Sequence, residues 1–63
     1  MTIEINHAGS AYVYRISPAD PCLIERRANH RGARWTRYAY RPTPEEAKAA
    51  LLQLDAQMND FGV

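Results

Sequence analysis

Few side chains in this sequence have the chemistry of a nucleophile or a metal ligand. Cys22 and His30 would be the members of a thiolate pair, with Asp20 to orient the histidine, but a small lone cysteine is more often inert packing. A metal site would draw on His7, Cys22 and His30. These residues lack a close pair such as the Cys-x-x-Cys of structural zinc sites. The chain also lacks the glycine-rich motifs that cradle phosphates. We therefore expect a non-enzymatic protein without metal or cofactor.

Arginine and aromatic residues gather instead in one stretch. Residues 23–41 hold six arginines against the single carboxylate of Glu25, so this stretch carries a net charge of +5. Residues 1–22 carry −1 and residues 42–63 carry −3, which leaves +1 for the whole chain. Tryptophan, tyrosine and arginine are the types enriched at the energetic centres of protein interfaces. The sequence therefore predicts a partner-binding stretch made by Arg26, Arg27, Arg31, Arg34, Trp35, Arg37, Tyr38 and Tyr40.

Three interpretations of this basic stretch are open. In the first, its arginines are solvated surface, partly paired with carboxylates of the last third, and such pairs contribute about 0–1 kcal/mol each. In the second, they bind DNA or RNA, because arginine contacts phosphate and aromatic rings stack on unpaired bases. The isoelectric point of about 7.9 is low for that class, whose members typically exceed about 9. In the third, which we favour, they bind a larger protein of complementary charge.

A resemblance bears on the nucleic-acid interpretation. Residues 34–38, Arg-Trp-Thr-Arg-Tyr, followed by residues 43–47, Thr-Pro-Glu-Glu-Ala, resemble part of the arm-binding domains of phage integrases. Those domains look like a three-stranded sheet with a C-terminal helix. The resemblance is confined to these two segments, and it implies DNA contact through the hairpin that ends in residues 34–40.

The last third offers a possible second surface, an acidic one made by Glu45, Glu46 and Asp55. Such carboxylates could imitate a row of phosphates and occupy a nucleic-acid-binding cleft. In size and character the chain is similar to small inhibitors encoded by phages and mobile elements, anti-CRISPR proteins among them. We therefore expect an inhibitor or adaptor that acts by covering a site on a larger protein complex.

Short segments must position these residues. Alternating or β-favouring residues predict strands over residues 2–6, 11–16, 22–28 and 34–40, separated by turn signals that include Asn29–Gly32. Alternation places Tyr12, Tyr14 and Ile16 on one face of their strand. In the last strand it places Trp35 and Ala39 on one face, with Tyr38 and Tyr40 on the other.

Residues 43–60 have the pattern of a helix. Thr43 is the expected N-cap, Pro44 suits the first helical position, and Glu46 completes a capping box. An apolar stripe at three- and four-residue spacing follows and can extend to Phe61, with Gly62 as the end: Ala47, Ala50, Leu51, Leu54 and Met58.

Together these signals predict one α+β domain over residues 1–63, an antiparallel meander of three or four strands with one helix packed on one face. One helix covers one face, so some aromatic side chains stay exposed or meet a second copy in a homodimer. The single Cys22 excludes an intrachain disulfide. No apolar run approaches the roughly 20 residues of a membrane span, and the first ten residues do not have the pattern of a signal peptide. We expect a cytoplasmic protein.

Overall fold

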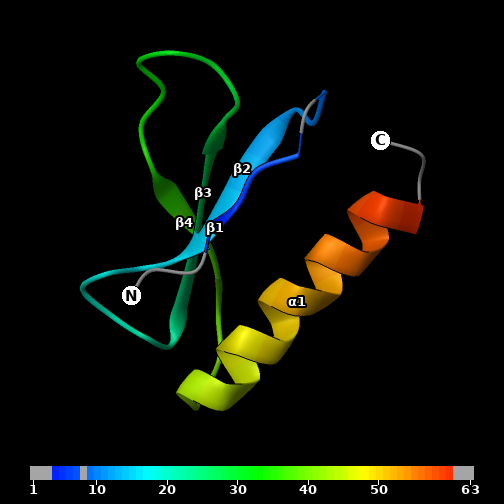
Figure 1. Ribbon diagram of the computed structural model, residues 1–63. Coiled ribbons are helices and arrows are strands. Elements are labelled where there is room, and N and C mark those ends of the chain that lie inside the picture. The colour runs from blue at the N-terminus through cyan, green and yellow to red at the C-terminus, as the bar shows by residue number, and fades with distance from the viewer. Residues whose placement is uncertain (1–3, 8, 61–63) are drawn as a thin grey trace.

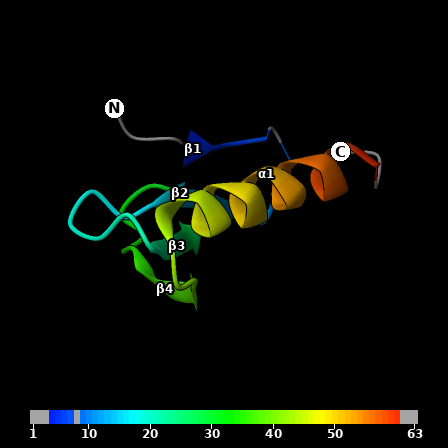
Figure 2. The same ribbon diagram turned by 90° about the horizontal axis from the view of Figure 1, so that it is seen from below.

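The computed structural model describes residues 4–7 and 9–60, with side chains as far as Gln57. Four strands precede one helix: β1 (Glu4–Ile5), β2 (Tyr12–Ile16), β3 (Leu23–Ala28), β4 (Thr36–Tyr40) and α1 (Pro44–Asp60). The strands form one antiparallel sheet in the order β1-β2-β3-β4, and Figure 2 shows them in that order with α1 on one side. The predicted α+β meander is confirmed in its four-stranded form, although Thr2 and Ile3 of the first segment lie outside the described residues.

The core lies between α1 and the face of the sheet that α1 covers, which we call the helix face. It is built from Ile5, Tyr14, Ile24, Ala47 and Leu51, with Ile16, Ala39, Ala50 and Leu54 packed against it. The apolar stripe of the helix is thus confirmed as far as Leu54. Met58, Phe61 and Gly62 lie outside the residues whose side chains are described. None of the described helices is long and apolar enough to cross a membrane.

The helix covers only part of its face. It packs mainly against β2 and β3, and Figure 1 shows it running diagonally past the sheet. The loop that joins β3 and β4, and the strand ends next to it, lie away from the helix. Gly32 turns this loop with a positive φ of 83°, a conformation that a side chain would strain. The basic hairpin therefore projects from the part of the sheet that the helix leaves free.

The start of α1 follows the predicted cap. The Glu46 backbone N–H donates to Thr43 Oγ1 at 3.2 Å, which satisfies one of the amide groups that a helix leaves open at its first turn. We expect Thr43→Ala to lower the free energy of unfolding by about 1 kcal/mol. Urea unfolding followed by circular dichroism measures this difference, with Thr43→Ser, which keeps the capping hydroxyl, as the matched control. A Thr43→Ala variant as stable as the parent would show that the cap contributes nothing.

The predicted faces of the last strand are wrong, because a register shift interrupts the pairing of β3 with β4. Ile24 pairs with Ala39, but the next residue, Glu25, pairs with Arg37, so Tyr38 is the extra residue of a β-bulge. Beyond a bulge the alternation of side chains changes phase. Trp35 and Ala39 consequently lie on different faces, and so do Tyr38 and Tyr40.

Candidate functional site

The predicted binding residues occupy both faces of the sheet as well as the loop between β3 and β4. Arg26 and Tyr38 lie on the helix face, beside the core. The opposite face, which we call the open face, has no element of the described chain packed on it. It carries Arg27, Trp35, Arg37 and Tyr40, as the pairing registers place them. Arg31 and Arg34 are exposed in the loop. The basic and aromatic side chains of the hairpin are thus divided between the helix face, the open face and the loop.

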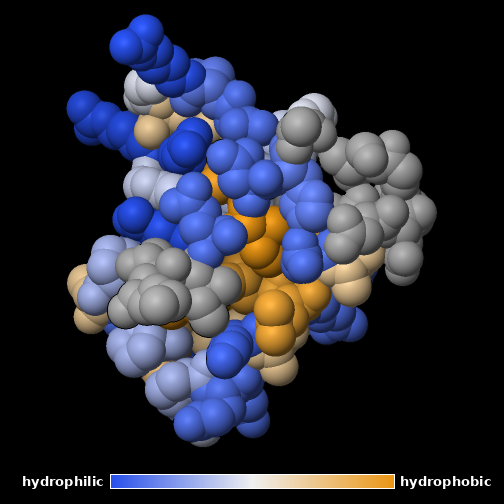
Figure 3. All heavy atoms as spheres, in the orientation of Figure 1, coloured by the Kyte–Doolittle hydropathy of each residue, from blue (hydrophilic) through white to orange (hydrophobic). Residues whose placement is uncertain are grey.

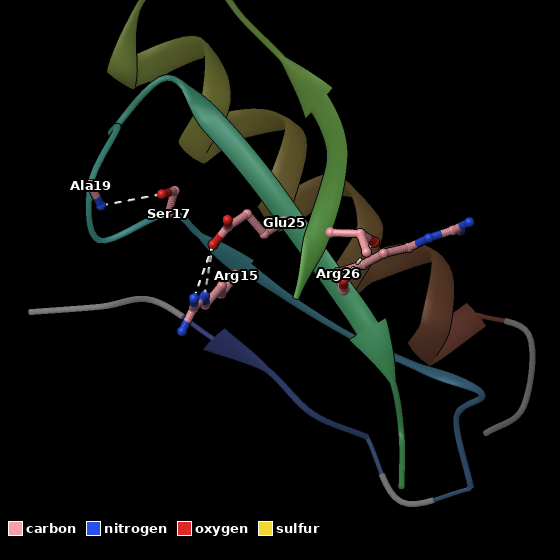
Figure 4. A network of polar contacts seen from close by, with 6 residues as sticks. Arg15, Ser17, Ala19, Glu25 and Arg26 are labelled. Atoms are coloured by element: carbon pink, nitrogen blue, oxygen red, sulfur yellow. Dashed lines mark hydrogen bonds and ion pairs between the residues drawn. The ribbon is translucent and has the colours of Figure 1, made fainter. Parts of the chain in front are cut away.

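Trp35 forms the centre of the open face. The guanidinium groups of Arg15 and Arg27 lie over its ring, 4.0 Å and 5.2 Å from the ring centroid. Arg15 is held in turn by Glu25, whose Oε1 accepts from Arg15 Nε and Nη2 at 3.0 Å. Figure 4 shows this pair, with Arg26 extending away from it. Val13 pairs with Arg27 and is fully buried on this same face, so the open face has a small packed centre of its own.

We expect Glu25→Gln to loosen Arg15 from Trp35. The pair is less than a quarter exposed, so its loss should lower the free energy of unfolding by about 1 kcal/mol. The emission of Trp35, the single tryptophan of the chain, should shift at the same time.

Glu4→Gln is the matched control, because Glu4 is exposed and lies opposite Arg15 on its other side. An unchanged Trp35 emission in the Glu25→Gln variant would show that Glu25 does not position Arg15 over the ring. The Glu4→Gln control should leave this emission unchanged.

Tyrosines form the corresponding cluster on the helix face. The Arg26 guanidinium lies 4.3 Å from the ring centroid of Tyr12 and 5.0 Å from that of Tyr38. Tyr38 meets Tyr14 edge to face, with the ring centroids 5.0 Å apart. Tyr12 and Tyr38 are about two-fifths exposed. Tyr12, Tyr14 and Arg15 were missing from the predicted site. Tyr12 and Tyr14 could have been found from their two-residue spacing, whereas nothing local connects Arg15 with Trp35.

Three predicted arginines are exposed and make no ion pair with any side chain that the structure describes. Among the side chains that the structure describes, the ion pairs are Arg15–Glu25 and His7–Asp55, and neither involves Arg31, Arg34 or Arg37. In Figure 3 the surface over the β3–β4 loop is strongly hydrophilic, while hydrophobic side chains gather between the sheet and the helix. The idea that helix carboxylates pair with these arginines therefore finds no support among the described residues.

The acidic residues of α1 do not form one face. Glu46 and Asp55 are nine residues apart, which places them on opposite sides of a helix with about 3.6 residues per turn. Asp55 is already engaged, since its Oδ1 lies 2.5 Å from His7 Nε2. Glu45 and Glu46 lie in the first turn, where negative charge favours the helix dipole. Glu45 and Glu46 therefore stabilise the start of the helix, and Asp55 joins α1 to the connection between β1 and β2.

The cysteine and the histidines are not brought together. Cys22 is half-buried just before β3, and its backbone N–H donates to Asp20 Oδ1 at 3.0 Å. His30 is exposed just after the same strand, so the six residues of β3 separate the two side chains by about 20 Å. Within the described residues no three potential ligands are close enough to hold a metal ion.

Shallow hollows border the hairpin: a small one of about 110 Å³ lies between β4 and α1, and two are larger. One, of about 340 Å³, lies along β4 and is lined by Asp20, Leu23, Arg37, Tyr38, Ala39 and Tyr40. The other, of about 530 Å³, is more open and lies at the loop, where Arg27, Asn29, His30 and Arg31 line it. The first combines aromatic and aliphatic walls with the Asp20 carboxylate and with the Arg37 guanidinium, which has no ion pair among the described side chains, so it offers a ligand apolar contacts and one basic group. The second is almost entirely polar.

Comparisons with known proteins yield no relative. No protein-family model, no curated protein and no solved structure matches the chain. The resemblance to the arm-binding domains of phage integrases therefore stays a prediction, and function has to be argued from the site.

Proposed function

We propose that this chain is a small, non-enzymatic protein-binding module, an inhibitor or adaptor that covers a site on a larger protein complex with its β3–β4 hairpin. The observation that carries the proposal is the group of exposed arginines on this hairpin, Arg31, Arg34 and Arg37, none of which has an ion pair among the described side chains. Tyr40, at the end of β4 away from the loop, is 61% exposed. Exposed guanidinium groups and an exposed ring on one hairpin match the composition of interface centres.

The arrangement of the aromatic rings favours a protein over a single-stranded nucleic acid. Base stacking needs free ring faces, yet guanidinium groups already lie over Trp35, Tyr12 and Tyr38. Tyr40 is the exposed ring of the hairpin without such a neighbour among the described residues. These features support an acidic protein surface as the partner.

We further propose that this interaction takes place in a reducing, intracellular compartment. One cysteine without a disulfide partner in the chain is typical of proteins from reducing compartments. The partner is then an intracellular complex, and the action is steric occlusion in the manner of small phage- or mobile-element-encoded inhibitors such as anti-CRISPR proteins.

The second candidate function is a DNA- or RNA-binding module that uses the same hairpin, favoured by the net charge of +5 over residues 23–41. Fluorescence anisotropy with a random-sequence duplex and a single strand, at roughly 50 and 200 mM salt, separates the two functions. We expect no micromolar binding to either probe at the lower salt concentration. Micromolar binding that falls steeply with salt would instead make the hairpin a phosphate-binding surface and replace the protein-binding proposal.

A further inference from the structure

The β4 strand leaves one edge of the sheet open. The strand order is β1-β2-β3-β4, so β4 pairs with β3 on one side, and no described strand pairs with its other side. An edge strand presents a row of unpaired backbone N–H and C=O groups, which form a template for a further strand. We propose that β4 binds the partner by β-augmentation, accepting an extended segment that carries an acidic side chain and, two residues further along on the same face, an apolar one. This inference rests on the proposed function and specifies how the hairpin recognises its partner.

The dimensions and exposure of β4 suit this role. It has five residues, of which four are exposed, and at about 3.4 Å per residue it offers about 17 Å of edge. That length matches a partner strand of ordinary size. Main-chain hydrogen bonds in this mode supply affinity, and alternate side chains supply specificity.

Side chains on the open face specify this spacing of an acidic and an apolar residue. Glu25 pairs with Arg37 and Leu23 pairs with Tyr40, so Arg37 and Tyr40 share a face on either side of the bulge. Glu25 is taken by Arg15, and Arg37 therefore stays available for a carboxylate of an added strand. Tyr40 and Leu23 line the hollow of about 340 Å³, which would take an apolar side chain two residues further along. Asp20, the acidic residue of this hollow, accepts the Cys22 N–H.

Charge also selects the occupant of the edge. A second copy paired through β4 would bring Arg37 and Arg41 of both chains to one short edge, and like charges across a strand pair are destabilising. Arg41 follows directly after β4, and its Nη1 donates to the carbonyl of Tyr40 at 3.0 Å. Basic side chains and a bulge are devices that discourage edge-to-edge pairing. Positive charge discourages strands of the same charge, and it attracts an acidic strand.

The direct probe is a fluorescein-labelled peptide in which glutamate and valine take turns at every second position, with threonine between them, so that both types lie on one face of the strand. We expect it to bind the intact chain and to slow amide hydrogen exchange along the open edge of β4. The same peptide with proline for its central valine should bind at least about tenfold more weakly, because proline lacks the N–H that a ladder needs. Arg37→Glu should abolish binding, whereas Lys48→Glu, the same charge reversal on the exposed side of α1, should not.

Other results would overturn the inference. Equal binding of the proline peptide would mean attraction by charge alone, and slowed exchange outside β4 would place the ligand elsewhere. A dimer with protected β4 amides in the absence of peptide would make a second copy the occupant. The proposed function is tested separately by alanine substitution of Arg31, Arg34 and Arg37. If those substitutions abolish partner capture while the peptide fails to bind, the β-augmentation is wrong and the protein-binding function stands.

Discussion

Leu51→Ala is expected to leave most of the chain unfolded at room temperature. The Leu51 side chain is fully buried in the cluster that joins α1 to Ile5, Tyr14 and Ile24. Truncating such a leucine costs about 2–5 kcal/mol. A core of this size supplies only about 3–5 kcal/mol in total, so the loss is comparable to the whole free energy of unfolding. Far-UV circular dichroism at rest and during urea unfolding measures the effect.

Leu52→Ala provides the matched control. Leu52 is the next residue of the same helix, but its side chain is 51% exposed, so the same chemical change should alter stability by no more than about 0.5 kcal/mol. Equal stability of the two variants would contradict the packing of α1 described above, because the two leucines differ mainly in which side of the helix they occupy.

Combined substitution of Arg31, Arg34 and Arg37 by alanine is expected to weaken partner binding by at least about 100-fold. Each arginine at an interface centre contributes on the order of 1 kcal/mol or more, and about 1.4 kcal/mol corresponds to a tenfold change in Kd. The thermal midpoint should change little, because these side chains are exposed and make no ion pair among the described residues. Capture of the partner by immobilised chain, together with thermal unfolding, gives both quantities.

Lys48→Ala is the control for this loss of positive charge, since Lys48 is exposed on α1, outside the hairpin. Its capture of the partner should equal that of the parent chain. Undiminished capture by the triple variant, at an unchanged thermal midpoint, would show that the hairpin arginines are not the binding surface.

The helix and the strand order could be predicted because several local signals agree. Thr43 and Pro44 mark the helix start, and the spacing of Leu51 and Leu54 gives its buried side. The face on which each β4 side chain lies could not be predicted. One additional residue, Tyr38, shifts the alternation of side chains between the two faces, and no residue type at that point indicates a bulge.

The charge of the site could be predicted, but the grouping of its residues could not. The basic character of residues 23–41 follows directly from composition. Arg15 lies outside that stretch, and only the folded sheet brings it over Trp35 and against Glu25. Contacts between residues from separate strands depend on register, which a bulge and turn geometry decide.

Site-specific photo-crosslinking tests the central claim, that the hairpin side of the domain meets a protein. A photoreactive phenylalanine replaces Tyr40 in one variant and Leu52 in another, two apolar positions that are 61% and 51% exposed on β4 and on α1. Each variant is irradiated in a bacterial lysate, with and without prior nuclease treatment. We expect a discrete protein adduct from position 40 that disappears when Arg31, Arg34 and Arg37 are replaced by alanine, and no such adduct from position 52. An adduct from position 52 alone, or one that nuclease treatment removes, would show that the hairpin does not bind a protein directly.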